Sequence, residues 1–143
     1  LLPAILFLVA IFLSFSTGTS WGTFAILVPI AIAMFPGADN MQMMIIAVAS
    51  VLSGAVCGDH VSPISDTTVM SSAGAQSNHI NHVTTQMQYA VVVAVVSAIG
   101  YVIAGFVHIW WLVLGISAVL LLVVLFVIKA VTSDEKDGVK KRA

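Results

Sequence analysis

Residues 57–68 read C-G-D-H-V-S-P-I-S-D-T-T, and the interpretation of the whole chain follows from this segment. It contains Asp59 and Asp66, the only charged residues between Asp39 and Lys129. The sequence on both sides of it is apolar over lengths that suit lipid. Charged and unpaired polar groups are strongly unfavourable in hydrocarbon, so they usually face a cavity or the interior of a helix bundle. The segment therefore predicts a polar functional site inside a membrane-embedded protein.

The composition excludes a soluble domain. Hydrophobic residues make up 60% of the 143 residues and charged residues 8%, whereas soluble domains average about 45–50% and about 25%. A chain of this length could not hide so much apolar surface from water, so lipid must be its solvent. We expect an all-α membrane protein, a polytopic helix bundle in the cell membrane.

Positive charge is confined to the end of the chain. All five Lys and Arg residues lie in residues 129–143. Because cytoplasmic segments next to membrane spans are enriched in Lys and Arg, this charged tail is predicted to be cytoplasmic. The remaining residues, 1–128, are then the transmembrane domain.

Two short apolar runs open the chain. Residues 2–16 and 23–35 are each shorter than the ~20 residues that cross a bilayer. Between them, residues 17–22 read T-G-T-S-W-G, in which glycines and hydroxyls disfavour continued helix. The pattern fits either a re-entrant hairpin over 1–35 or one long helix unwound in its middle, and we favour the hairpin.

A broken helix is predicted over residues 41–75, followed by full-length spans at 84–106 and 109–128. Gly58 and Pro63 are the expected helix breakers, because Pro63 lacks an N–H group and pushes Ser62 away from helical angles. The break should free backbone carbonyls and begin a new helix near Ser65. Asp66 there is either a helix cap or an ion or proton ligand.

Asp59 is the strongest candidate for an ion- and proton-binding residue. Burial favours the protonated form of a carboxyl group, and a nearby cation favours the ionised form. Such a carboxylate can hold a proton or Na⁺ but not both, which is the minimal mechanism of an antiporter. The alternative is a structural Asp59 satisfied by backbone N–H groups. His60 beside it could relay protons or orient the carboxylate.

Hydroxyl groups could complete a cation site. Oxygen atoms are the ligands that hard cations prefer. Near Asp59 the candidates are Ser62, Thr67 and Thr68, and at the hairpin tip they are Thr19, Ser20 and Thr23. The tip could instead be a simple interfacial loop. His79 and His82 lack a third ligand, so we expect no metal beyond Na⁺ and no cofactor.

The motifs T-G-T-S-W-G-T and G-D-H-V-S-P-I-S-D-T-T-V-M-S-S-A-G-A, followed by H-I-N-H-V, resemble the NhaC family of sodium/proton antiporters. That family includes Na⁺/H⁺ exchangers and malate/lactate exchangers. It is similar to the ion-transporter superfamily, whose inverted repeats each contain a re-entrant hairpin and a broken helix. The resemblance implies that the chain is the C-terminal half of such a transporter. The family's polar motif carries over as Asp59, His60, Ser62, Ser65, Asp66, Thr67 and Thr68.

The resulting prediction is a Na⁺/H⁺ antiporter, with Na⁺- and H⁺-coupled malate/lactate exchange as the variant. The expected partners are Na⁺, H⁺, the lipid bilayer, a missing N-terminal half of the transporter and a second copy in a homodimer, without nucleic acid. An accessory membrane subunit without its own site is another alternative. An intramembrane aspartyl protease fits poorly, because Val56 stands where a G-x-G-D motif needs glycine.

Overall fold

A computed structural model describes residues 1–107 and 109–140. These residues form six α-helices and one short 3₁₀ turn, with no strand among them. The elements are α1 (Leu2–Thr17), α2 (Ser20–Ala33), η1 (Ala38–Asn40), α3 (Met41–Val61), α4 (Asp66–Gly74), α5 (His79–Ala104) and α6 (Trp110–Lys140). Three stretches are long and apolar enough to cross a membrane: Met41–Val61, His79–Ala104 and Trp111–Ala130. The expected all-helical class is confirmed.

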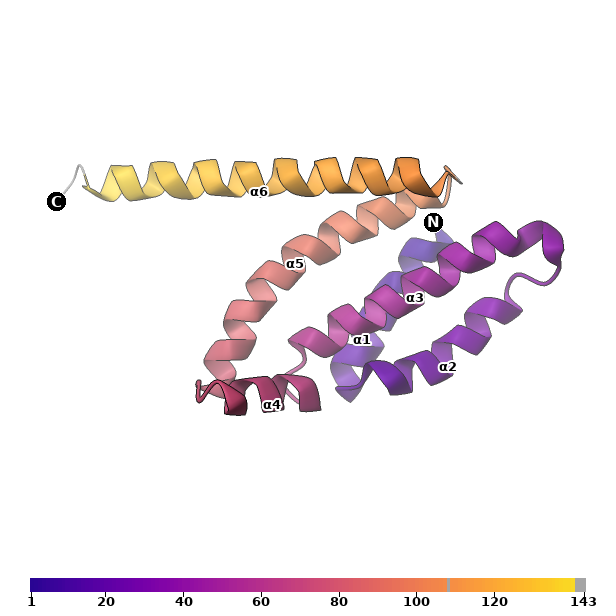
Figure 1. Cartoon of the computed structure of the whole chain (residues 1–143), viewed down its shortest axis with the longest axis horizontal. Helices are drawn as coiled ribbons and strands as arrows, with labels where there is room; N and C mark the ends of the chain where they lie inside the picture. The colour runs from indigo at the N-terminus through magenta and orange to yellow at the C-terminus, as the bar shows by residue number, and fades with distance from the viewer. Residues whose placement is uncertain (108, 141–143) are drawn as a thin grey trace.

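The first two helices form a hairpin with a tight turn (Figure 1). Gly18 ends α1 in the left-handed conformation, with φ of 68°, and its N–H bonds to the Ser14 carbonyl. Thr19 then caps α2, accepting a hydrogen bond from Gly22 N–H. The predicted break at 17–22 therefore narrows to two residues, since glycine adopts positive φ without strain.

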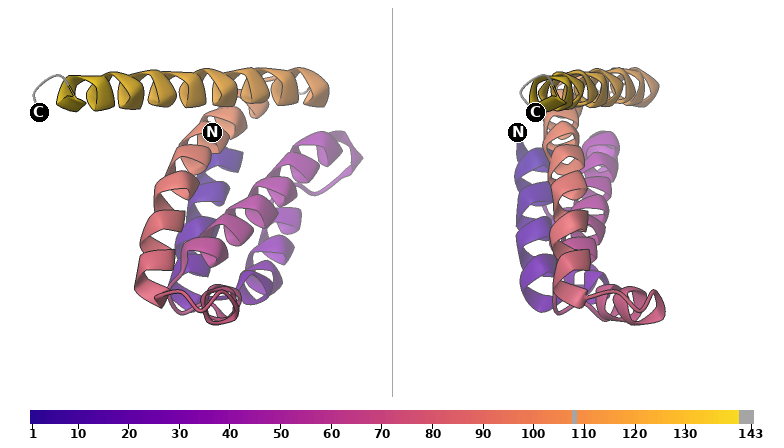
Figure 2. Two further views of the ribbon diagram at one scale, coloured as in Figure 1. Left: turned by 60° about the vertical axis from the view of Figure 1, so that its left-hand side comes forward. Right: turned by 90° about the vertical axis from the view of Figure 1, so that its left-hand side faces the viewer.

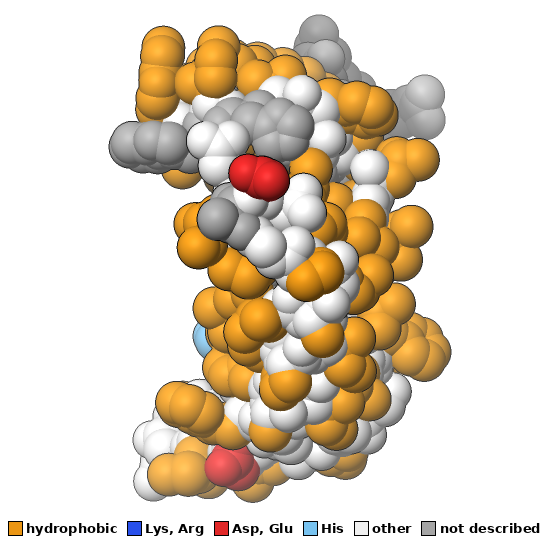
Figure 3. Space-filling view, turned by 90° about the vertical axis from the view of Figure 1, so that its right-hand side faces the viewer, with side chains coloured by type: hydrophobic (Ala, Val, Ile, Leu, Met, Phe, Trp, Pro, Cys, Tyr) orange, Lys and Arg blue, Asp and Glu red, His pale blue; other side chains and the backbone are white. Residues whose placement is uncertain are grey.

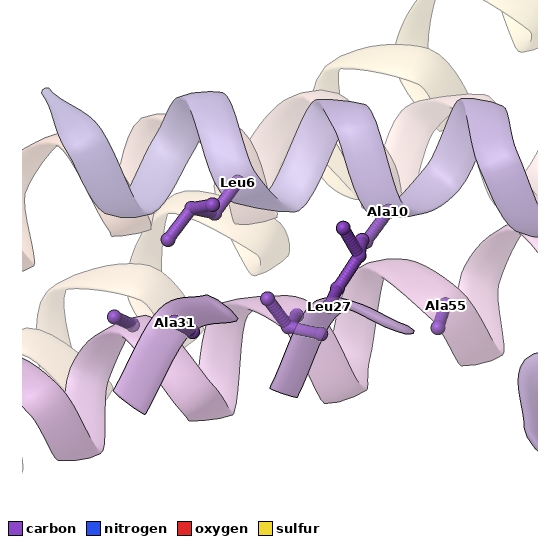
Figure 4. Close-up of a cluster of buried hydrophobic side chains, with 7 residues drawn as sticks. Leu6, Ala10, Leu27, Ala31 and Ala55 are labelled. Atoms are coloured by element: carbon purple, nitrogen blue, oxygen red, sulfur yellow. The ribbon is translucent and has the colours of Figure 1, made fainter. Parts of the chain in front are cut away.

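The hairpin packs on α3 through a small apolar core. Leu6 and Ala10 of α1, Leu27 and Ala31 of α2 and Ala55 of α3 are buried together (Figure 4). Mutual packing of α1 and α2 against one partner helix identifies a helical hairpin rather than a single long helix with an unwound middle.

Glycines let α1 and α3 approach closely. A Cβ added at Gly54 would collide with the Phe7 carbonyl oxygen, and one at Gly58 with the Ile11 carbonyl oxygen. Small residues at such spacing permit backbone contact between membrane helices. Gly58 is therefore helical and serves as a contact point, because α3 continues through it to Val61. Its expected role as a helix breaker is not what the structure shows.

The break itself spans residues 62–65 and contains Pro63. Ser62 and Ser65 are both extended, and α4 begins at Asp66, close to the predicted position near Ser65. Figure 1 shows α4 lying beside the start of α5, turned away from the direction of α3. The break thus changes the direction of the chain at the end of α3, a helix long enough to cross a membrane.

Tyr101 attaches α5 to the hairpin and to α3. Its ring lies 5.2 Å from that of Phe7, and its hydroxyl lies 2.6 Å from Ser53 Oγ. Helix α5 begins at His79, earlier than the predicted 84, because Asn78 caps it by accepting from Asn81 N–H. The two further views of Figure 2 show α6 crossing the ends of the other helices. It continues helically to Lys140, into the predicted tail.

Large apolar side chains cover the outside of the described chain. Phe12, Trp21, Met70 and Tyr89 are each more than 70% exposed. In Figure 3, hydrophobic side chains predominate on the visible face, and acidic ones are seen only toward its upper and lower ends. Water-soluble monomers rarely expose such continuous apolar surface, so this face suits lipid or neighbouring protein.

Candidate functional site

Asp59 lies at the meeting point of the two sequence breaks. It occupies the last turn of α3 and is only 6% exposed. Ser20, the first residue of α2, donates its hydroxyl hydrogen to Asp59 Oδ2 at 2.9 Å. Ser65, the residue that precedes α4, donates to Asp59 Oδ1 at 2.6 Å. The hairpin tip and the helix break therefore bind the same carboxylate from two sides.

A third hydroxyl extends this network. Thr67 Oγ1 lies 2.8 Å from Ser65 Oγ. The single hydroxyl hydrogen of Ser65 is already directed at Asp59, so Thr67 is the donor in this pair. The resulting chain of hydrogen bonds runs from Thr67 through Ser65 to the carboxylate. It orients Ser65 so that its lone pairs face Thr67 and its hydrogen faces Asp59.

No basic side chain balances the charge of Asp59 within the described residues. The sequence contains no Lys or Arg before Lys129. His60, the neighbouring residue, is exposed, and its Nδ1 lies 3.1 Å from the Val56 carbonyl of its own helix. A buried carboxylate is strongly unfavourable unless a positive charge or a proton compensates it. The negative charge of Asp59 could therefore be compensated by one cation or by one proton.

Backbone contacts fix the loop that carries Ser65. Ser62 is fully buried and donates to the Phe15 carbonyl at 2.8 Å. A Cβ added at Gly18 would lie 3.0 Å from the carbonyl oxygen of Ile64. The hairpin tip and residues 62–65 are therefore in direct contact, and a shift of one must move the other.

Other predicted ligands are buried nearby but have local partners. Thr68 donates to the His60 carbonyl at 3.3 Å and so links α4 to the end of α3. Thr23 donates to the carbonyl of Thr19, and the Thr19 hydroxyl accepts from Gly22 N–H. These hydroxyls shape the break and the tip, and the hydrogen bonds described here do not reach Asp59.

Asp66 lies apart from the Asp59 carboxylate network. Its side chain is exposed, and Oδ1 accepts the N–H of Thr67 at 2.8 Å. Of the two interpretations of this residue, the geometry favours a local role at the start of α4. The structure thus brings Ser20, Ser65 and Thr67 to Asp59 and leaves Asp66 and His60 facing outward.

Two polar residues were not singled out as site candidates from the sequence. Ser14 of α1 is fully buried, and its hydroxyl has no hydrogen-bond partner among the described residues. His79 contacts the carbonyl of Pro63 in the break. The sequence signal for Ser14 is its four-residue spacing from Ala10, which places it on the buried face of α1. For His79, no local sequence pattern indicates its contact with Pro63.

An apolar groove lies away from Asp59. It encloses about 640 Å³ between α3, α5 and α6, and is lined mainly by apolar side chains such as Ile45, Tyr101 and Leu114. Asp59 is not among its lining residues. No cluster of three His, Cys, Asp or Glu side chains that could hold a metal occurs in residues with described side chains.

Comparison of the sequence with known proteins identifies the family of the chain. The model of the Na⁺/H⁺ antiporter family matches residues 1–106, which include both breaks and every predicted site residue. The chain belongs to the Na⁺/H⁺ antiporter family. The resemblance noted from the sequence motifs is thereby confirmed.

Individual known proteins are similar to this chain over much of its length. An uncharacterized protein of Haemophilus influenzae is 49% identical over 128 residues, which is 90% of this chain and 24% of that protein. The malate-2H⁺/Na⁺-lactate antiporter of Bacillus subtilis is 34% identical over 67% of this chain and 20% of its own length. An uncharacterized Na⁺/H⁺ antiporter of H. influenzae is 33% identical over 72% of this chain and 22% of its own length.

The chain spans only about a quarter or a fifth of the length of these relatives. No solved structure matches it. The family is therefore established by sequence, and the arrangement of the hairpin, the break and the carboxylate comes from the present structure.

Proposed function

We propose that the chain forms the ion- and proton-binding part of a secondary antiporter that exchanges Na⁺ for H⁺, with Asp59 as the group that holds either one. The observation that carries this proposal is the buried carboxylate with two hydroxyl donors and no counter-charge among the side chains that the structure describes. In such a site, binding of a proton and binding of Na⁺ exclude each other, because each neutralises the same charge.

The hydroxyl groups explain how the site accepts either charge. Ser20 and Ser65 donate to an ionised Asp59, which supports the carboxylate between binding events. When Na⁺ enters, the same hydroxyl oxygens can turn their lone pairs toward it, since a hydroxyl is both donor and acceptor. The break was expected to free backbone carbonyls, but those of His60 and Pro63 accept side-chain hydrogen bonds, so this proposal relies on the hydroxyl oxygens.

The two breaks give this site a means of changing access. Ser20 belongs to the hairpin and Ser65 to the segment before α4, so movement of either element alters one side of the carboxylate shell. Alternating access in transporters with repeated architecture commonly shifts one element against another around a fixed site. Asp59, on the close-packed α1–α3 pair, is the fixed component in this scheme.

Membrane placement follows from helix lengths. Helices α1 and α2 contain 16 and 14 residues, fewer than the ~20 that span a bilayer. In our proposal they form a re-entrant hairpin in one half of an inverted-repeat transporter, and the rest of the transporter completes the site. The cell membrane is the proposed location, with residues 129–143 in the cytoplasm and a second copy as a possible dimer partner.

Organic-acid exchange is the second candidate, favoured by the similarity to the malate-2H⁺/Na⁺-lactate antiporter. An organic anion would need a cationic or N–H-rich site. The N-terminus of α4 suits an organic anion poorly, because Asp66 places a negative charge there and accepts the hydrogen bond of the Thr67 N–H. Within this chain, the geometry therefore favours cation binding over binding of an organic anion.

The experiment that tests the proposal measures dissipation of a pH gradient in proteoliposomes. The complete transporter containing this chain is compared with its Asp59→Asn variant, and Na⁺, Li⁺, K⁺ or malate plus lactate is added. We expect Na⁺ to collapse the gradient only when Asp59 is present. Proton movement only with malate and lactate would select the exchanger variant, and full Na⁺ response in Asp59→Asn would reject the proposal in favour of an accessory role.

A further inference from the structure

The imidazole of His79 connects α5 to the break and to α4. His79 Nε2 lies 2.7 Å from the Pro63 carbonyl oxygen. On the other side of the ring, Nδ1 lies 2.9 Å from Ser72 Oγ. A single side chain at the start of α5 thus binds both the segment that carries Ser65 and the helix that follows it.

The partners define the direction of these hydrogen bonds. A carbonyl oxygen can only accept, so Nε2 carries the hydrogen in the bond to Pro63. In the neutral ring, Nδ1 accepts the Ser72 hydroxyl. In the charged ring, Nδ1 donates to Ser72 Oγ, whose hydrogen turns to the Val69 carbonyl at 2.9 Å. Both ring nitrogens therefore have partners within the protein.

The contact occurs where the chain has few other restraints. Only Thr68 and Ser72 of α4 are buried, so apolar packing contributes little to its position. Pro63 stands two residues before Ser65, whose hydroxyl donates to Asp59 Oδ1. A restraint on the Pro63 carbonyl is consequently a restraint on the orientation of the hydroxyl that binds the carboxylate.

We propose that His79 is a positioning residue for the cation site at Asp59, acting through the Pro63 carbonyl. This inference rests on the proposed function of Asp59 and adds to it a residue of α5, whereas the described hydrogen bonds to the carboxylate come from Ser20 and Ser65. It also replaces the idea of a His79–His82 metal pair, since His79 already uses both ring nitrogens in protein hydrogen bonds.

The test replaces His79 with glutamine or asparagine, whose amide nitrogens lie at different distances from the backbone. The amide nitrogen of glutamine can take the place of Nε2 and donate to the Pro63 carbonyl, whereas that of asparagine lies near the position of Nδ1 and falls short. His79→Ala, His79→Gln and His79→Asn are made in the complete transporter. His82→Gln, one turn further along α5, is the matched control, and Asp59→Asn is measured in the same vesicles.

We expect His79→Ala to raise the KM for Na⁺ about threefold to tenfold, the effect of losing one hydrogen bond, while the maximal rate changes little. His79→Gln should restore most of the affinity for Na⁺. His79→Asn should behave like His79→Ala. The control His82→Gln should behave like the wild type. A purely structural role would instead lower the amount of folded protein, measured by size-exclusion chromatography, without this split between KM and rate.

Two outcomes overturn the inference while leaving the proposed function intact. One is an unchanged KM in His79→Ala when Asp59→Asn is inactive. The other is a His79→Gln variant that folds but has no higher Na⁺ affinity than His79→Asn. Full Na⁺-driven proton flux in Asp59→Asn rejects the proposed function itself, and the assignment of His79 falls with it.

Discussion

Ser20 and Asp59 are 39 residues apart in the sequence, and Ser20 Oγ lies 2.9 Å from Asp59 Oδ2. This hydrogen bond joins the tip of the α1–α2 hairpin to the end of α3. Together with the bond from Ser65, it brings two separate interruptions of apolar sequence to one buried carboxylate. The predictions below concern this meeting point and the helix contacts that support it.

The first prediction concerns the Ser20 hydroxyl. Ser20→Ala removes one donor to Asp59 and one oxygen for Na⁺, and hydrogen bonds to charged groups contribute about 1.5–3 kcal/mol. We expect the KM for Na⁺ to rise about tenfold or more, measured as Na⁺-dependent proton flux in proteoliposomes. Ser16→Ala is the control, because Ser16 is exposed and bonds only to the Phe12 carbonyl of its own helix. Equal KM values for the two variants would show that Ser20 is not part of the site.

The second prediction concerns the close contact of α1 and α3. In Gly58→Ala the new Cβ collides with the Ile11 carbonyl, a backbone atom that cannot rotate away. We expect a loss of stability of about 1–3 kcal/mol, as for overpacked interiors, seen as a lower unfolding temperature in detergent. Gly74→Ala should be harmless, since no atom lies within 4 Å of its added Cβ. An unchanged unfolding temperature in Gly58→Ala would contradict the packing described here.

The third prediction separates backbone strain from contact at the hairpin tip. Gly18 and Gly37 both have positive φ, but only an added Cβ at Gly18 meets a neighbour, Ile64. Alanine at either position should lower the free energy of unfolding by about 1–2 kcal/mol, because the backbone there is left-handed and a side chain with a Cβ is strained in that conformation. Only Gly18→Ala should also slow Na⁺-driven proton flux, because it pushes the tip away from residues 62–65. Similar transport by both variants would mean that the contact is not needed.

The fourth prediction concerns orientation in the membrane. Single cysteines are placed at Asp39 and at Ser77, with Cys57 and every other cysteine of the complete transporter replaced. A membrane-impermeant thiol reagent should label Asp39→Cys from outside intact cells and Ser77→Cys only in inverted vesicles. This follows from a cytoplasmic tail, which places residues 36–40 outside and 76–83 inside. Labelling of both from the same side would refute the assigned topology.

Much of the architecture could be predicted from local sequence. Apolar run lengths indicated the helices, glycine and hydroxyl residues at 17–22 indicated the hairpin turn, and Pro63 indicated the second break. Each of these depends on properties of neighbouring residues along the chain. Asp59 was likewise recognisable, because an isolated charge in apolar sequence demands a special environment.

The errors arose where distant contacts decide the structure. Gly58 was expected to break the helix, but α3 continues through it. The lack of a side chain at Gly58 instead allows the Ile11 carbonyl of α1 to approach closely. His60 was a candidate proton relay, but its side chain is exposed, and for Asp66 the geometry favours the local role at the start of α4 that was one of the two alternatives. The pairing of Ser20 with Asp59 and the contact of His79 with Pro63 join residues far apart in sequence, which local periodicity does not encode.

The way in which α4 is attached has a mechanical consequence. Helices α1 and α3 share an apolar, glycine-lined interface, so separating them would expose buried surface along its full length. Helix α4 is instead fastened by individual polar links: Thr68 to His60, Ser72 to His79, and Ser65 to Asp59. Such links can be exchanged one at a time for others of similar strength. The molecule therefore combines a close-packed α1–α3 pair with a helix, α4, that is held by a few exchangeable hydrogen bonds. Ser65, directly before α4, is one of the two residues that donate to the carboxylate.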